Sequence, residues 1–291
     1  MKYVKCGAGV CSLRTAEGCR DTDVVIPDSV FLKGKVVEID NYAFRNETQI
    51  NSVAVPEGIV SIGDGAFENC TNLETILLPQ TLKSIGRNAF LHCEKLRSVL
   101  LPAGLTSIAD ASFACCYSLE AIDLRCVRSI GKYAFAKCDS LRNITISDSL
   151  EKIYAHSFQN TGYAKNRTQW TGGLLSVGKW VIGCNGQSDE YTIPRSTVGI
   201  AADVFHEEQH VKRTRNPEYD YLMEQFETAL VCPQAPLPDF SGVPEHFEEI
   251  VPVKLFYEGT SEEWKKIVKL PGEKRIPAVV TTLNGTIHTS F

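Results

Sequence analysis

The apolar residues of this chain recur in blocks of about 23 positions. A phenylalanine that follows a small residue marks each block, and the successive spacings are 23, 23, 23, 22 and 23: Phe44, Phe67, Phe90, Phe113, Phe135 and Phe158. A fixed period of this length is the signature of a solenoid, in which each repeat buries its apolar face only against its neighbours. We therefore predict a stack of similar coils.

Each block contains a run of the form Leu-x-x-Ile/Val-x-Leu, as in residues 73–78. Apolar residues at alternate positions predict a short strand with one buried face. Such strands pair in parallel about 4.8 Å apart, and Pro79 and Pro102 end the pairing because proline has no N–H to donate. The Ile85-Gly86 pair and its equivalents predict a tight turn on the return path.

The composite pattern LxxIxLPxxLxxIGxxAFxxC, which extends over roughly residues 20–205, resembles the BspA-like (Treponema pallidum type) leucine-rich repeat proteins. The resemblance implies an α/β-type or mainly β solenoid. This is a right-handed leucine-rich repeat superhelix of eight or nine coils, with a parallel sheet on the concave side and a cap at each end. It also implies a bacterial surface or secreted protein that binds host or matrix molecules, which is an adhesion function.

The extent of the repeat pattern divides the chain into three parts. Residues 1–205 are predicted to form the solenoid with an amino-terminal cap, and residues 251–291 a last repeat and a carboxy-terminal cap. Between these two parts, residues 206–250 are first rich in charged residues and then contain several prolines. We therefore predict that they form an insertion. A shorter interruption at 159–190 contains alternating apolar residues, which predict two strands joined by a turn at Gly178.

Four of the eleven cysteines occupy one repeat position: Cys70, Cys93, Cys116 and Cys138. We predict that they are small buried residues that fill the interior of the coils. Disulfides between neighbouring coils are disfavoured because the side chains would run parallel. Another three cysteines (Cys6, Cys11 and Cys19) lie outside the repeat, where a disulfide and a metal site both remain open.

The strand positions between the buried residues form three columns when the repeats are aligned. The first reads Asn51, Glu74, Arg97, Glu120 and Arg142; the second reads Ser52, Thr75, Ser98, Ala121 and Asn143; the third reads Ala54, Leu77, Leu100, Asp123 and Thr145. Opposite charges on neighbouring strands favour a self-paired ladder that sets the register. The alternative is an interface, because exposed apolar side chains often mark one. The candidate partner-binding residues are Glu74, Leu77, Arg97, Leu100, Glu120, Asp123 and Arg142.

Composition and charge argue against some classes of function. The chain has 291 residues, a formal net charge of −5 and no run of lysine or arginine, which argues against nucleic-acid binding. No apolar run approaches the roughly 18–20 residues that span a membrane. The first residues lack a signal-peptide pattern, which favours a cytoplasmic protein, whereas the resemblance implies the cell surface or secretion. We predict no cofactor, and the sequence leaves the oligomeric state open.

One stretch has a catalytic pattern, because His206-Glu207-Glu208-Gln209-His210 matches H-E-x-x-H. On a helix the two histidines would bind zinc and Glu207 would act as a general base. The intervening residues are polar and no third ligand has a distinctive pattern, so we predict a non-catalytic scaffold. It would bind a protein or glycan through its concave face or residues 206–250. A zinc-dependent hydrolase and a purely structural or assembly role are the alternatives.

Overall fold

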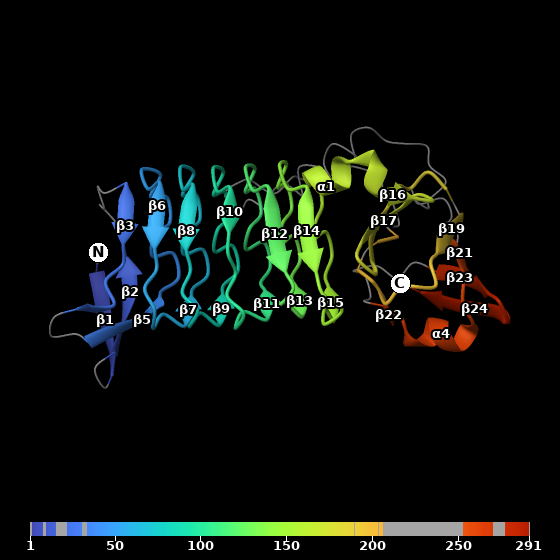
Figure 1. Ribbon diagram of the computed structural model, residues 1–291, viewed down its shortest axis with the longest axis horizontal. Helices are drawn as coiled ribbons and strands as arrows, with labels where there is room; N and C mark the ends of the chain where they lie inside the picture. Colours follow the sequence, from blue (N-terminus) through green and yellow to red (C-terminus); the bar gives the residue numbers. More distant parts are fainter. Residues whose placement is uncertain are drawn as a thin grey trace, which may run out of the picture.

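The computed structural model describes residues 2–7, 10–15, 22–30, 34–188, 190–202, 204–205, 253–269 and 277–290. The fold is a parallel-strand β-solenoid of about eight turns with little helix. Short strands lie in two rows along the first part of the molecule, and the chain then continues into the carboxy-terminal coils (Figure 1). One continuous hydrophobic core extends from Leu13 to Val280.

The first row holds the strands that the Leu-x-x-Ile-x-Leu runs predict. They are β3 (Asp23–Val25), β6 (Ser52–Ala54), β8 (Thr75–Leu77), β10 (Ser98–Val99), β12 (Ala121–Leu124) and β14 (Asn143–Ile146). They form two parallel sheets, β3 to β10 and β12 with β14. The register pairs Val53 with Ile76 and Ile122 with Ile144, which are 23 and 22 positions apart. The predicted alignment of the repeats is therefore confirmed within each of these two sheets.

The second row holds the return path of the same coils. Its strands are β5 (Gly34–Ile39), β7 (Ser61–Ile62), β9 (Ser84–Ile85), β11 (Ser107–Ile108), β13 (Ser129–Ile130) and β15 (Lys152–Ile153). At the amino-terminal end, β1 (Lys2–Gly7) and β2 (Val10–Thr15) form an antiparallel hairpin that joins β5 through β2. The short β4 (Ser29–Val30) pairs with β5 from the other side.

The six marker phenylalanines stack along the core. Successive ring centroids lie 4.8, 5.2, 5.1, 5.5 and 5.5 Å apart, and no pair is tilted by more than 11°. The rings repeat at nearly the spacing of the paired strands, because each coil places its phenylalanine at the same point. Phe67, Phe90, Phe113 and Phe135 have no exposed surface.

The four repeat cysteines lie beside this stack and are buried and free, as predicted. Each thiol donates to the backbone carbonyl oxygen of the phenylalanine one coil before its own. The distances are 3.1 Å from Cys70 to Phe44 and 3.2 Å from Cys93 to Phe67, and Cys116 and Cys138 repeat the contact. Burial raises the pKa of Cys70 to about 12 and raises the pKa of Cys93 well above its usual value. The thiols therefore act as weak internal donors.

The tight turn predicted at the Ile-Gly step is present, because the Gly63 carbonyl accepts a hydrogen bond from the Ala66 N–H at 3.4 Å. The glycines of this step do not have a positive φ, so the turn is not the reason for glycine. A Cβ on Gly86 would lie 2.5 Å from Asp64 Oδ1 and 2.6 Å from the Asp64 nitrogen, and Gly63 and Gly131 meet the preceding coil in the same way. The Asp64 carboxylate accepts a hydrogen bond from the backbone N–H of Arg87 at 2.7 Å. Glycine is present because it allows this close approach between coils.

In each coil, the residues with a positive φ lie two positions before and two positions after the marker phenylalanine. The positions are Tyr42, Gly65, Asn88, Ala111, Tyr133 and His156 before it, and Asn46, Asn69, His92, Cys115, Lys137 and Asn160 after it. Eleven of these twelve residues are not glycine, although a positive φ costs a non-glycine residue roughly 1–2 kcal/mol. The backbone hydrogen bonds between coils hold them there, for example from Asn46 N to the Glu68 oxygen at 2.8 Å.

The interruption after Phe158 adds a hairpin to the solenoid. It contains α1 (Gly162–Lys165), the 3-10 turn η1 (Arg167–Gln169), β16 (Trp170–Thr171), β17 (Leu174–Val177) and β18 (Trp180–Cys184). Strands β17 and β18 are antiparallel, and Gly178 between them has a φ of 54°, so the predicted turn is confirmed.

The solenoid continues in register across residues 206–250. Strands β19 (Glu190–Ile193) and β20 (Gly199–Ile200) pair in parallel with β21 (Val253–Tyr257) and β22 (Val268–Lys269). Ile193 and Tyr257 are partners although they lie 64 positions apart. The strand pair predicted after residue 278 is also present, as the antiparallel β23 (Pro277–Thr282) and β24 (Gly285–Ser290).

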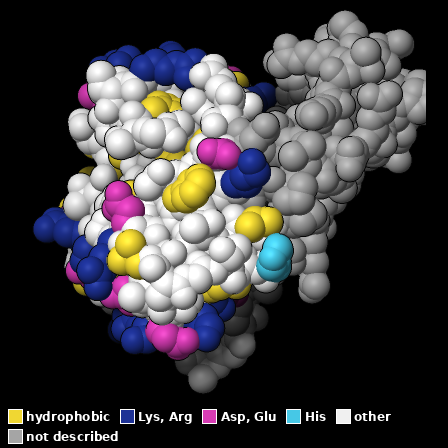
Figure 2. Space-filling model, turned by 90° about the vertical axis from the view of Figure 1, so that its right-hand side faces the viewer, with side chains coloured by type: hydrophobic (Ala, Val, Ile, Leu, Met, Phe, Trp, Pro, Cys, Tyr) yellow, Lys and Arg dark blue, Asp and Glu magenta, His cyan; other side chains and the backbone are white. Residues whose placement is uncertain are grey.

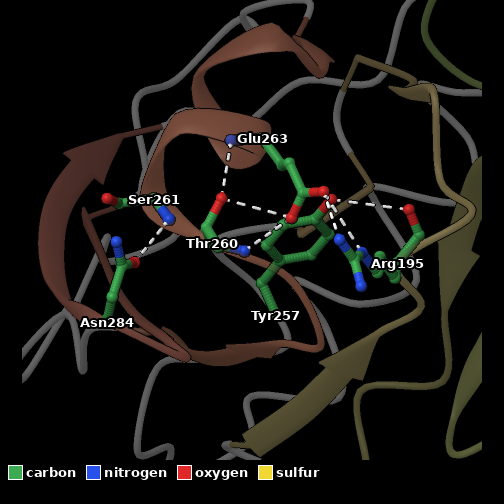
Figure 3. Close-up of polar contacts among 6 residues, drawn as sticks. All are labelled: Arg195, Tyr257, Thr260, Ser261, Glu263 and Asn284. Carbon is green, nitrogen blue, oxygen red and sulfur yellow. Dashed lines mark hydrogen bonds and ion pairs between the residues drawn. The ribbon is translucent and has the colours of Figure 1, made fainter.

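A polar network joins these two coils (Figure 3). Glu263, in α4 (Ser261–Lys266), accepts hydrogen bonds from the Thr260 backbone N–H at 2.8 Å and from Arg195 Nη2 at 2.6 Å. These contacts, the Thr260 bond first, lower the pKa of Glu263 to about 2. Asn284 accepts the Ser261 N–H at 2.8 Å and fixes the same helix to the turn before β24.

The carboxy-terminal end of the molecule shows hydrophobic side chains that are scattered singly among polar atoms (Figure 2). Within the described ranges, no helix has the length and apolar character needed to cross a membrane.

Candidate partner-binding face

The seven candidate residues lie in the strands of the first row or directly beside them, and all seven are exposed. Glu74, Arg97, Glu120 and Arg142 each stand immediately before a strand, while Leu77, Leu100 and Asp123 stand near the strand ends. Here we call these sets the charged column (Glu74, Arg97, Glu120, Arg142) and the apolar column (Val25, Leu77, Leu100). Val25 was not among the sequence candidates, although β3 brings it into line through Ala54.

Backbone hydrogen bonds fix the register of the charged column. Each residue donates its N–H to the carbonyl oxygen of the equivalent residue in the preceding coil. The distances are 2.8 Å for Glu74 to Asn51, 3.3 Å for Arg97 to Glu74, and 3.1 Å both for Glu120 to Arg97 and for Arg142 to Glu120. Opposite charges thus follow one another at every coil step.

The expected ladder of ion pairs is nevertheless not formed. In the part of the chain that the structure describes, none of these four side chains takes part in an ion pair or a side-chain hydrogen bond. Pairs between neighbouring coils do form elsewhere, as between Arg128 and Glu151 at 2.8 Å. An exposed ion pair contributes only about 0–1 kcal/mol to stability, and forming it restrains two long side chains. Water can therefore compete with the opposite charge for each side chain. The prediction of a self-paired ladder is therefore wrong.

The apolar column lies on the same face. The exposed fractions are 74% for Val25, 69% for Leu77 and 76% for Leu100. These side chains contribute little to the core, which is formed by the alternate residues Val24, Ile76 and Val99. The column stands three residues from the charged column, which corresponds to at most about 10 Å of extended chain.

The residues between the two columns are small, namely Ser52, Thr75, Ser98, Ala121 and Asn143. This set, which we call the small column, places short side chains between the long charged ones and the leucines. Thr75 pairs with Ser52 and Ser98 in one sheet, and Ala121 pairs with Asn143 in the other.

Asp123 differs from the other members of its column because it is held by Arg125. Both carboxylate oxygens of Asp123 accept the Arg125 Nε–H at 3.0 Å, and these bonds lower the pKa of Asp123. The coil here is the one with a spacing of 22, and its turn lacks the proline that the earlier coils have. The spacing of 22 is visible in the sequence, but its effect on the turn is not.

A pocket of about 280 Å³ opens at this shortened turn. Its lining is Leu100, Leu101, Leu105, Asp123, Arg125, Cys126 and Val127. Leu100 contributes its exposed side chain to this pocket, Leu105 and Val127 line it from the core, and Arg125 and Asp123 form a polar border. Cys126 is exposed here, in contrast to the buried cysteines of the repeat.

The other candidate sites lie largely outside the described residues. This applies to the H-E-x-x-H stretch at 206–210, to the whole predicted insertion 206–250, to Cys19 and to the side chains of Cys6 and Cys11. Among the described residues, no group of three His, Cys, Asp or Glu side chains is arranged to hold a metal ion.

The fold and this face define a leucine-rich repeat solenoid. The family described as "BspA type Leucine rich repeat region (6 copies)" matches residues 37–165 and 106–219, which together exceed half of the chain. The chain belongs to this BspA-type leucine-rich repeat family. No curated protein matches it.

Solved structures of bacterial leucine-rich repeat proteins are similar to the chain. A leucine-rich cell surface protein from Faecalibacterium prausnitzii is 19% identical with a TM-score of 0.53, and the match covers 70% of this chain and 71% of that one. The T. pallidum leucine-rich repeat protein is 24% identical with a TM-score of 0.44, over 52% and 81% of the two chains. A leucine-rich repeat protein from Bacteroides ovatus is 20% identical with a TM-score of 0.40, over 93% and 65%. At 19% identity, the likeness to the Faecalibacterium prausnitzii protein is one of fold alone.

Proposed function

We propose that this chain is a non-catalytic scaffold that binds a protein partner through the outer face of the first row of strands. The observation that carries the proposal is the charged column, whose four alternating charges have no ion-pair partner within the described chain, beside an exposed apolar column. Charged side chains that have no ion-pair partner within the chain can favour a binding partner of complementary charge. The exposed leucines provide apolar surface that such a partner can bury.

A protein fits this face better than a glycan. The three columns contain charged, small and aliphatic residues and no aromatic side chain. A solenoid offers a broad surface instead of a deep enclosed site, which favours macromolecular partners. A long row of charges and leucines matches the mixed surface of another protein.

The proposal is tested by affinity capture with the purified chain from the lysate and culture medium of its source organism. The test variant is Leu77→Asp/Leu100→Asp. The control is Ser84→Asp/Ser107→Asp, which adds the same two charges to exposed positions of the second row. We expect a protein that the wild type and the control retain and that the test variant loses at least about tenfold. Equal retention by all three, or a glycan as the retained molecule, would refute the proposal.

A further inference from the structure

We infer that the partner element bound by this face is an amphipathic α-helix, laid along the solenoid axis, whose successive turns carry alternating basic and acidic residues. The inference rests on the proposed function and names the chemistry of its partner. It is carried by the spacing of the coils, the distance between the columns and the order of the charges.

The coil spacing matches the pitch of a helix. Equivalent phenylalanine rings of successive coils lie 4.8–5.5 Å apart, and an α-helix advances 5.4 Å per turn. Over the three coil steps from Glu74 to Arg142, a helix drifts out of step by only about 0.4 Å. In an extended strand, side chains on one face recur about every 6.7 Å. Over the same three steps, such a strand drifts out of register with the coils by about 4 Å, which is nearly one coil spacing. A helix can therefore place one side chain opposite every charge of the column.

The width of the face also matches a helix. The charged and apolar columns stand three residues apart, which is at most about 10 Å of extended chain, and a helix with its side chains is about 10–12 Å wide. The small column between them leaves room for the body of the helix. Its apolar flank would meet Leu77, Leu100 and the pocket beside Leu105.

The order of charges then specifies the partner. The charged column reads negative, positive, negative, positive from Glu74 to Arg142. A complementary helix carries Lys, Glu, Lys and Glu at positions i, i+4, i+7 and i+11, which lie on one face. Because the four column side chains have no ion pair within the described chain, a new pair breaks no existing one.

Two synthetic helical peptides of equal composition test the charge order. Both carry leucines on the adjoining stripe, and the interacting face reads Lys-Glu-Lys-Glu in the alternating peptide and Lys-Lys-Glu-Glu in the block peptide. We expect the wild-type chain to bind the alternating peptide about tenfold more tightly at low salt. The preference should shrink at high salt, because the pairs are exposed.

A charge swap gives the matched control. Arg97→Glu/Glu120→Arg keeps the net charge and converts the column to negative, negative, positive, positive, so this variant should prefer the block peptide by a similar factor. Equal thermal unfolding midpoints of the two proteins would show that the swap leaves the fold intact. A preference that stays the same after the swap, or no binding of either peptide up to about 1 mM, would overturn the inference.

The helical conformation has its own control. An alternating peptide with a central proline cannot form a continuous helix, so it should bind at least about tenfold more weakly than its parent. Equal binding of the two would overturn the helical form of the partner. If the peptide results fail while Leu77→Asp/Leu100→Asp still abolishes partner capture, the inference falls and the proposed function stands.

Discussion

At the scale of single residues, each coil repeats a few contacts that depend on position more than on side-chain identity. The buried thiol of Cys93 donates to the Phe67 carbonyl of the coil before, and its three counterparts do the same. Residues two positions from each phenylalanine adopt a positive φ whether they are Asn, Lys, His or Tyr. Contacts between coils therefore override the local preference of the residue.

The thiols provide a residue-scale prediction. Under native conditions, a maleimide should modify Cys126 rapidly and Cys70, Cys93, Cys116 and Cys138 at least about 100-fold more slowly, because burial raises the pKa of the repeat thiols and blocks access. Mass spectrometry of digested protein reads each site separately, and Cys126→Ser identifies its peptide. Fast modification of the four repeat cysteines would show that the register of the coils is wrong.

At the scale of elements, neighbouring coils are held by close backbone approach as well as by strand pairing. Gly86 lies against Asp64 of the preceding coil, whose carboxylate binds the next backbone N–H. In the carboxy-terminal coils, Glu263 combines a capping box with Thr260 and an ion pair with Arg195. These contacts help to keep β21 in line with β19, although the two strands are far apart in the sequence.

Adding one methyl group at the coil contact should be costly. Gly86→Ala places a Cβ within 2.6 Å of two backbone atoms, which cannot give way, so we expect a loss of about 2–3 kcal/mol in the free energy of unfolding. The matched control is Gly183→Ala, where the nearest atom would be 3.6 Å away. Urea unfolding of both variants measures the difference. Equal stabilities would contradict the assigned role of Gly86.

The Glu263 network should make the carboxy-terminal coils sensitive to acid. Its pKa is about 2 in the fold and near 4.5 when unfolded, so its contribution is complete above pH 4.5 and is lost as the pH falls towards 2. Glu263→Gln should therefore be less stable than the wild type at neutral pH and should lose less stability on acidification. Urea unfolding between pH 7 and about pH 2 tests this. Parallel pH profiles for both proteins would exclude the role given to Glu263.

At the scale of the whole molecule, periodicity alone predicts the coils, the strand register and the three outer columns. Phe67 and Ile76 mark positions that recur, and a solenoid converts recurrence directly into neighbours. Periodicity could not predict the role of Gly86, which depends on a distance between coils. It could not predict the unpaired state of Arg97, which depends on competition with water. The pocket at Cys126 arises from one missing residue, whose effect on the turn appears only in three dimensions.

The most direct test of the binding face is site-specific photo-crosslinking. A photoreactive residue is placed at Thr75, in the small column, or at Ser84, an exposed position in the second row of strands. After mixing with the captured partner and irradiation, our account predicts a covalent adduct from position 75 and none from position 84. An adduct from position 84, or from neither position, would contradict the assignment of the outer face of the first row as the docking surface.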